Sequence, residues 1–183
     1  MKIPKQAKKV FTGKIFDIYQ WPQKMFDGSI ETYEMIKRNG TIEVIPVMDN
    51  KIVLIYEQQP TLKASYSVIG GRQEDKETPL QAAKRELLEE TGLVSNDWEL
   101  IKRFYPHNKM DFKISRYIAR NCKKVSEQNL DAGEKIILKP VNFKNFMNII
   151  TDENFRSQDL TTDILKMKYF GKLEKFKKKL FKK

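Results

Sequence analysis

Short runs of hydrophobic residues, separated by polar and turn-forming residues, divide the chain into segments that predict strands and a few helices. Residues 52–56 (IVLIY) are almost wholly apolar, which indicates a central strand buried on both faces. The predicted strands are 10–21, 31–38, 41–47, 52–56, 66–69, 98–105, 112–119 and 136–141. The predicted helices are 79–91, 143–150 and 160–170, and the predicted loops are 58–64 and 121–135. This order predicts a mixed sheet with one central helix and further helices at the C-terminal end, which is an α+β or mixed α/β fold.

The segment 79–91 carries the clearest boundary signals of any predicted helix. Thr78 is a favourable N-cap, Pro79 suits the first helical position, and Gln81 completes a capping box. Gly92 suits the position after the helix, where a left-handed residue is common. The chain is therefore expected to turn into a helix at Pro79 and to leave it at Gly92.

Three glutamates, Glu86, Glu89 and Glu90, project from about a third of this helix's circumference, because each helical residue advances by about 100°. The simplest interpretation is a solvated acidic face. However, like charges at these spacings repel, and the helix dipole disfavours anions in the last turns. Both effects indicate that a cation completes the face, and clustered carboxylates suit a hard divalent ion such as Mg²⁺ or Mn²⁺.

Composition narrows the chemistry further. The chain has 183 residues, of which 40% are hydrophobic and 32% charged, as expected for one globular domain. It has one cysteine, Cys122, and one histidine, His107, which exclude an internal disulfide and any site that needs two histidines. No apolar run approaches the roughly 20 residues that span a bilayer, and a cytoplasmic location is expected. Catalysis in this chain must therefore depend mainly on carboxylates.

Most of the net charge of +11 belongs to the C-terminal tail. Residues 166–183 hold nine lysines and one glutamate, which leaves about +3 for the rest of the chain. Within the tail, apolar residues follow helical spacing among the lysines at Leu173, Phe176 and Leu180. The favoured interpretation is a terminal helix docked on the domain, and the alternative is contact with nucleic acid or an anionic membrane.

The stretch from residue 71 to residue 93 matches a known motif. Its specified positions are Gly71, Glu77, Arg85-Glu86-Leu87, Glu89-Glu90 and Gly92-Leu93. With every spacing kept, this stretch resembles the signature of the Nudix hydrolases. The resemblance implies an α/β/α sandwich around a mixed sheet, with the motif forming a loop, a helix and a second loop. It also implies metal-assisted hydrolysis of the pyrophosphate bond of a nucleoside diphosphate linked to another moiety.

The resemblance also implies roles for individual residues. Glu86 and Glu90 are the leading metal ligands, Glu89 is a third ligand or assists water activation, and the Gly70 carbonyl is a further ligand. Arg85 is expected to orient the glutamates by ion pairing, and Glu77 to brace the loop. The cofactor is therefore expected to be Mg²⁺ or Mn²⁺.

Residues 26–60 resemble the N-terminal part of the ADP-ribose and nucleoside-diphosphate-sugar pyrophosphatases. The expected organisation is a small antiparallel sheet over residues 1–40 that supports a homodimer, a hydrolase domain over 41–171, and a basic tail over 172–183. Pro106 lies near the place where this subgroup carries a marker proline. The expected substrate is ADP-ribose or a related nucleotide sugar.

The chain departs from that subgroup at one substrate-binding position, and the resemblance leaves two candidates for the catalytic base. Gln58-Gln59-Pro60 replaces a Gln-Tyr-Arg sequence of many relatives, so Arg38 or Arg72 is expected to supply the missing cation to the substrate. A late acidic loop is expected to carry the catalytic base, with Glu134 as the main candidate and Asp131 as the second. Other functions compatible with the sequence are hydrolysis of dinucleoside polyphosphates or capped RNA, and non-catalytic binding of nucleotide or RNA.

Overall fold

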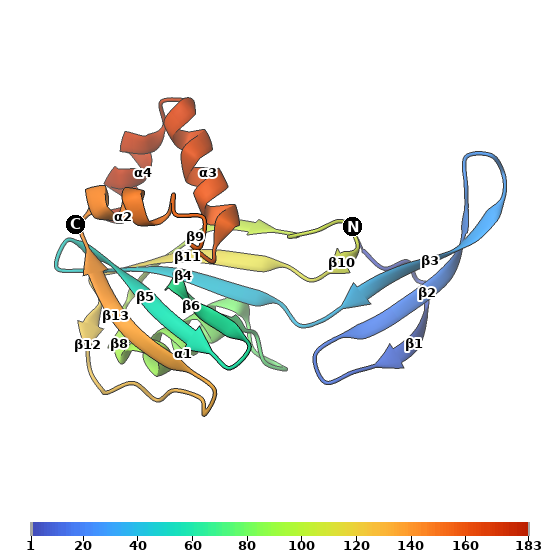
Figure 1. Cartoon of the computed structure of the whole chain (residues 1–183), viewed down its shortest axis with the longest axis horizontal. Coiled ribbons are helices and arrows are strands. Elements are labelled where there is room, and N and C mark those ends of the chain that lie inside the picture. The colour runs from blue at the N-terminus through green and yellow to red at the C-terminus, as the bar shows by residue number, and fades with distance from the viewer. Residues whose placement is uncertain (1, 183) are drawn as a thin grey trace.

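A seven-stranded mixed sheet forms the centre of the computed structural model, which describes residues 2–182 (Figure 1). The strand order is β13–β5–β4–β11–β9, while β6 pairs with β5 and β7 pairs with β4. These strands are β4 (Thr41–Met48), β5 (Lys51–Gln59), β6 (Leu62–Ser67), β7 (Ile69–Arg72), β9 (Asp97–Phe104), β11 (Ile114–Arg120) and β13 (Lys135–Val141). Only the pair formed by β4 and β11 is parallel, so the sheet is mixed as expected.

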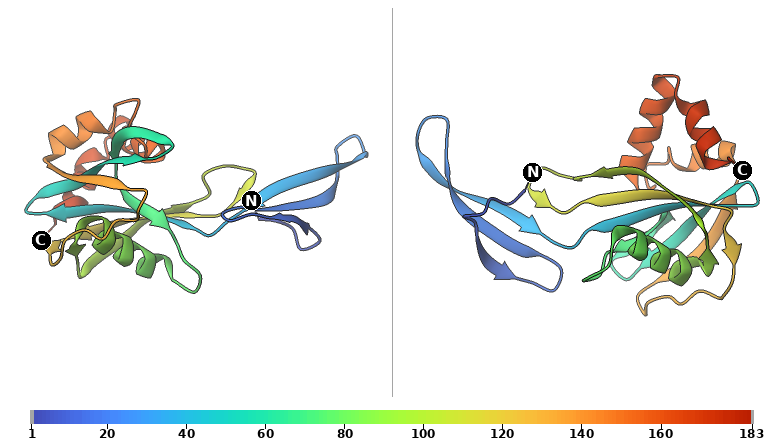
Figure 2. Two further views of the ribbon diagram at one scale, coloured as in Figure 1. Left: turned by 60° about the horizontal axis from the view of Figure 1, so that its bottom comes forward. Right: turned by 180° about the vertical axis from the view of Figure 1, so that it is seen from behind.

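Helices cover both faces of this sheet (Figures 1 and 2). On one face lies α1 (Pro79–Thr91), and on the other lie α2 (Phe143–Ile149), α3 (Gln158–Tyr169) and α4 (Leu173–Leu180). Two hydrophobic clusters correspond to the two faces: one contains Ala83 and Leu87 of α1, and the other contains Phe146 and Ile164. Strand β5 contributes to both clusters, because successive side chains point to opposite faces. The predicted burial of 52–56 on two faces is thus confirmed, and the fold is an α/β/α sandwich.

A second sheet extends away from the sandwich at the N-terminal end (Figures 1 and 2). It contains β1 (Lys8–Thr12), β2 (Asp17–Lys24) and β3 (Ile30–Lys37), which pair antiparallel, and β10 (Met110–Asp111), which joins β3 in parallel. Because β10 is parallel to β3, this sheet is not the wholly antiparallel sheet that was expected. The prediction of one strand over 10–21 was also wrong, because the chain turns after β1, where the Gly13 N–H donates to the Phe16 carbonyl.

The predicted loop at 58–64 was also wrong. Strands β5 and β6 form a hairpin through this segment, with Gln59 opposite Leu62 and Glu57 opposite Ser65. Strand β6 stops at Ser67, and the glycine pair belongs to a separate strand, β7, which pairs with β4. Because β6 is mostly exposed at its start, its sequence lacks the apolar alternation by which strands are predicted.

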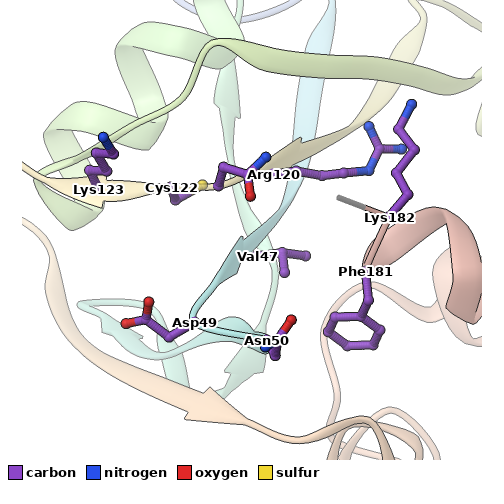
Figure 3. A pocket seen from close by; sticks show the side chains of 9 residues that line it. Val47, Asp49, Asn50, Arg120, Cys122, Lys123, Phe181 and Lys182 are labelled. Atoms are coloured by element: carbon purple, nitrogen blue, oxygen red, sulfur yellow. The ribbon is translucent and has the colours of Figure 1, made fainter.

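The basic tail forms α4 and docks on the domain, as the favoured interpretation predicted. Phe176 and Leu180 are buried, and the Lys179 carbonyl accepts a hydrogen bond from buried Arg120. Figure 3 shows Arg120, Phe181 and Lys182 among the residues that line a cavity of about 300 Å³. None of the motif glutamates lines this cavity. In residues 2–182, no helix is long and apolar enough to cross a membrane.

The predicted loop at 121–135, which follows β11, is mostly irregular, as expected. It contains one short strand, β12 (Lys123–Lys124), which pairs with β8 (Leu93–Val94) directly after α1. Its remaining backbone lies close to the C-terminal end of α1, which fixes the position of the acidic residues that follow.

Candidate active site

The glutamate-bearing helix begins and ends where its sequence predicts. The Thr78 hydroxyl accepts from the Gln81 N–H, and the Gln81 side chain accepts from the Thr78 N–H at 2.8 Å, so the capping box is complete. At the other end Gly92 has a φ of 68°, and its N–H donates to the Leu88 carbonyl. A Cβ at Gly92 would lie 2.0 Å from the Ser126 carbonyl oxygen, so only glycine fits there.

Arg85 holds the acidic side chains of the motif together. Its guanidinium donates to both carboxylate oxygens of Glu77, at 2.8 and 3.1 Å, and to the Arg72 carbonyl at 3.1 Å. The Nη1 atom lies 2.9 Å from a carboxylate oxygen of Glu86 and 2.9 Å from one of Glu89. These hydrogen bonds lower the pKa of Glu77 and keep Arg85 protonated. Arg85 therefore ties the glycine-containing loop to the carboxylates on the helix.

The glycine pair of β7 gives the carboxylates their space. A Cβ at Gly71 would lie 2.1 Å from an Oε atom of Glu86, so the Glu86 carboxylate occupies the place of the missing side chain. At Gly70, a Cβ would lie 2.7 Å from the Ile42 carbonyl oxygen, and the Gly70 N–H faces the Glu90 carboxylate. Both glycines are thus required by close approach and not by backbone conformation.

Glu90 is the most deeply buried carboxylate of the cluster, with 4% of its surface exposed. One carboxylate oxygen, Oε2, is fully buried and has no hydrogen-bond partner among the described residues. Burial, reinforced by the negative charges of Glu86 and Glu134, raises the pKa of Glu90 to about 9. A buried carboxylate without a donor or a cation is destabilising, so this atom indicates a missing positive partner.

Glu86, Glu89, Glu90 and Glu134 line one cavity of about 240 Å³. Burial raises the pKa of Glu86, against the effect of Arg85, and burial also raises the pKa of Glu134. The same cavity is lined by Gly70 and by Asp131. The structure therefore brings together the glutamates of the helix and the acidic loop that the sequence placed about 45 residues downstream.

The end of α1 holds that acidic loop in place. The Asn129 N–H donates to the Glu89 carbonyl at 2.8 Å, and the Gln128 side chain donates to the Glu90 carbonyl at 2.7 Å. These bonds satisfy C-terminal carbonyls that the helix itself leaves free. Asn129 also lines the cavity, and it was missed because a polar residue in a polar loop carries no distinguishing signal.

The donor set fits a hard divalent cation. All four glutamates offer oxygen ligands, and the partnerless Glu90 oxygen is an available one. Within residues 2–182, no three acidic, histidine or cysteine side chains are already gathered into a metal-holding group. The Arg85 guanidinium forms an ion pair with one carboxylate oxygen of Glu86 and with one of Glu89, so these two oxygens face Arg85.

A larger cleft of about 800 Å³ adjoins the acidic cavity, and Gly70, Gly71 and Arg72 line both. Arg38 lines this cleft as well; its guanidinium lies 4.5 Å from the centre of the Phe112 ring and donates to the Thr41 hydroxyl. Burial and the nearby charge of Arg72 lower the pKa of Arg38. In the part of the chain that the structure describes, neither arginine forms an ion pair, so both guanidinium groups at the cleft keep an unpaired positive charge.

Sequence reasoning missed a third arginine of the cleft. Arg156, which precedes α3, forms an ion pair with Glu57 of β5, and both side chains line the cleft. The pair joins residues that are about 100 positions apart, so no local pattern could have identified it. Pro106 and His107 lie at the same cleft.

Comparison with known proteins gives concordant matches. A family model for the NUDIX domain matches residues 37–145, which is more than half of the chain. The "ADP-ribose pyrophosphatase" of Bacillus subtilis (strain 168) is 25% identical over 147 residues, covering 78% of this chain and 80% of that protein. The "Methanol dehydrogenase activator" of Bacillus methanolicus is 27% identical over 137 residues, covering 73% and 74% respectively.

A solved structure, "Crystal structure of ADP compounds hydrolase", superposes with a TM-score of 0.72 and 19% identity. The match covers 92% of this chain and 95% of that one, so it includes the N-terminal sheet as well as the sandwich. At this identity the likeness shows the fold.

Proposed function

The chain belongs to the NUDIX family and is a Nudix hydrolase. We propose that it cleaves the pyrophosphate bond of ADP-ribose or a related nucleotide sugar in a metal-dependent reaction. The observation that carries the proposal is that the cavity of four glutamates and the larger cleft adjoin, with Gly70, Gly71 and Arg72 lining both. One compartment suits metal ions and phosphate oxygens, and the other has room for the two ends of a nucleotide sugar. The curated relative named as an ADP-ribose pyrophosphatase supports this choice of substrate.

The proposed cofactor is Mg²⁺ or Mn²⁺, held by Glu86 and Glu90, with Glu89 and the Gly70 carbonyl as further ligands. Such an ion, when bound, neutralises pyrophosphate oxygens and acidifies a coordinated water. Arg85 positions the carboxylates and does not contact substrate in this proposal, because its donors are already used by the loop and the helix.

Glu134 is the proposed general base. It lines the cavity from a different segment than the helix glutamates, and burial raises its pKa toward neutrality. A carboxylate with a raised pKa takes a proton from water more readily than an ordinary one. Asp131 remains the second candidate, since it lines the same cavity.

The proposed substrate site is completed by Arg72 and Arg38, whose unpaired charges suit the anionic diphosphate. We also propose that residues 1–40 support a homodimer. In the N-terminal sheet, Phe11 and Ile30 are 56% and 69% exposed, and Phe26 is fully exposed, which leaves apolar surface available for a second copy.

Hydrolysis of a substrate panel tests the proposal. ADP-ribose, a nucleoside-diphosphate hexose, a dinucleoside polyphosphate and a capped RNA are incubated with the protein and Mg²⁺, and products are separated by ion-exchange chromatography. We expect the greatest kcat/KM with ADP-ribose or the nucleotide hexose, with AMP or another nucleoside monophosphate as a product. A higher kcat/KM with the dinucleoside polyphosphate or the RNA would reject the proposed substrate class.

A further inference from the structure

The turn that joins α3 to α4 exposes an aromatic pair. Tyr169 is 85% exposed and Phe170 is 65% exposed, and their rings meet edge to face with centroids 5.1 Å apart. Leu165, one helical turn before Tyr169, is 41% exposed. Together these three residues form an apolar cluster at the end of the helix pair, which we call the α3–α4 tip.

Lysines surround the α3–α4 tip on both sides in sequence. Lys166 and Lys168 precede the aromatic pair, and Lys172 and Lys175 follow it, and all four are exposed. Within residues 2–182, none of the four forms an ion pair, whereas Lys179 and Lys182 further along α4 both pair with Glu99. Glu174 is the one acidic residue from Lys166 to Lys175, so the apolar cluster lies within a segment of net positive charge.

Packing of the domain does not account for this exposure. The inward face of α4 already contributes Phe176 and Leu180 to the hydrophobic core, and Leu173 packs against the same cluster. Tyr169 and Phe170 lie outside that core, at the turn where Gly171 has a φ of 68°. Figure 1 shows this turn at the top of the molecule, at the end of the helix pair away from the sheet.

The α3–α4 tip also lies on the opposite side of the sheet from the acidic cavity. Helix α1, which carries Glu86 and Glu90, covers the other face (Figure 2). A partner bound at the tip would therefore leave the glutamate cavity accessible.

We propose that the α3–α4 tip is a docking site for an anionic lipid surface. Aromatic rings at a membrane interface insert among the headgroups, and nearby lysines interact with anionic lipids while their aliphatic stems remain apolar. The convex shape favours a bilayer over a nucleic acid, because single strands bind along grooves and stack on flat aromatic faces. Here the two rings meet edge to face and offer no parallel stacking platform. The proposal does not depend on the identity of the nucleotide substrate.

Vesicle sedimentation tests the proposal with the full chain. The wild-type protein is mixed with phosphatidylcholine vesicles in which about a third of the lipid is phosphatidylserine, at low and at high salt. The test variants are Tyr169→Ser/Phe170→Ser and Lys166→Gln/Lys168→Gln/Lys172→Gln. Val125→Ser controls for loss of an exposed apolar residue elsewhere, because Val125 is 59% exposed, and Lys8→Gln/Lys51→Gln/Lys63→Gln controls for the change in net charge.

We expect the wild type and both controls to sediment with the anionic vesicles at low salt and to be released at high salt. Each test variant should bind at least about tenfold more weakly, while its thermal unfolding and its hydrolysis of soluble substrate stay unchanged. Absence of sedimentation, or equal binding by test and control variants, would overturn the proposal. Binding of a single-stranded RNA oligonucleotide in place of the vesicles, with loss in the same variants, would also overturn it in favour of a nucleic-acid surface.

Discussion

Replacing Glu90 with glutamine should make the stability of the metal-free protein less sensitive to rising pH, and it should lower the activity. The side chain keeps its size, while the buried carboxyl group that can titrate is replaced by an amide that cannot. Between the ordinary pKa of a glutamate and about 9, the folded metal-free protein retains a proton that the unfolded chain has released. The wild type should therefore lose stability as the pH rises through this window, by about 1.4 kcal/mol per pH unit for one proton.

From this slope, metal-free wild type should lose about 3 kcal/mol between pH 6 and pH 8, and Glu90→Gln should lose much less. In a chain of this size, that difference corresponds to about 6–12 °C in the unfolding temperature. Differential scanning fluorimetry in the presence of EDTA measures it. The same variant should lose at least about 100-fold in kcat with Mg²⁺, because a ligand to the proposed metal is gone.

Glu127→Gln is a suitable control, because the side chain of Glu127 is 95% exposed and the change removes one charge without disturbing the cavity. This control should leave both turnover and the pH dependence of unfolding as they are in the wild type. The reasoning fails if Glu90→Gln retains near-normal turnover, or if it lowers stability equally at pH 6 and pH 8.

Three further substitutions test other parts of the site. Gly71→Ala should lower kcat at least about tenfold in a steady-state assay with little change in melting temperature, because the new methyl group displaces the Glu86 carboxylate; normal kcat would show that the position of Glu86 is unimportant. Arg72→Gln should raise KM about tenfold with a smaller effect on kcat, as expected for loss of one charge-assisted contact, and an unchanged KM would place the diphosphate elsewhere. Thr78→Ala should cost about 1 kcal/mol in urea-induced unfolding through loss of the helix cap, whereas the exposed control Thr61→Ala should cost little; equal effects would contradict the capping argument.

Local signals made the glutamate-bearing helix predictable. The cap at Thr78, the proline that follows it and the terminal Gly92 fix both ends of α1, and the helix runs over the predicted 79–91. The spacing of the glutamates then places their side chains on one side of the helix, and the structure finds them around one cavity. No tertiary information was needed for this part.

Other parts depend on contacts between distant segments. The edge strand β6 is partly exposed and lacks apolar alternation, so the β5–β6 hairpin was mistaken for a loop. The cleft brings together Arg38, Arg72 and Arg156 from three separate segments, and only the fold determines their proximity. The likeness to one subgroup indicated Arg38 and Arg72, but it gave no indication of Arg156.

The pairing of Arg156 with Glu57 shows how such a contact escapes sequence reasoning. Glu57 lies in β5, just after the apolar run at 52–56 by which this strand was predicted. Arg156 lies in an irregular stretch between α2 and α3. Neither position is distinctive by itself. Their chemistry appears only when the sheet and the helices are assembled.

The most direct test of the account is the metal dependence of ADP-ribose hydrolysis. Protein treated with EDTA and then dialysed should release no AMP from ADP-ribose, and addition of Mg²⁺ or Mn²⁺ should restore release of AMP and ribose 5-phosphate. Equal rates with and without the divalent ion, or no hydrolysis with either ion while ADP-ribose still binds, would contradict a metal-dependent pyrophosphatase built on Glu86 and Glu90.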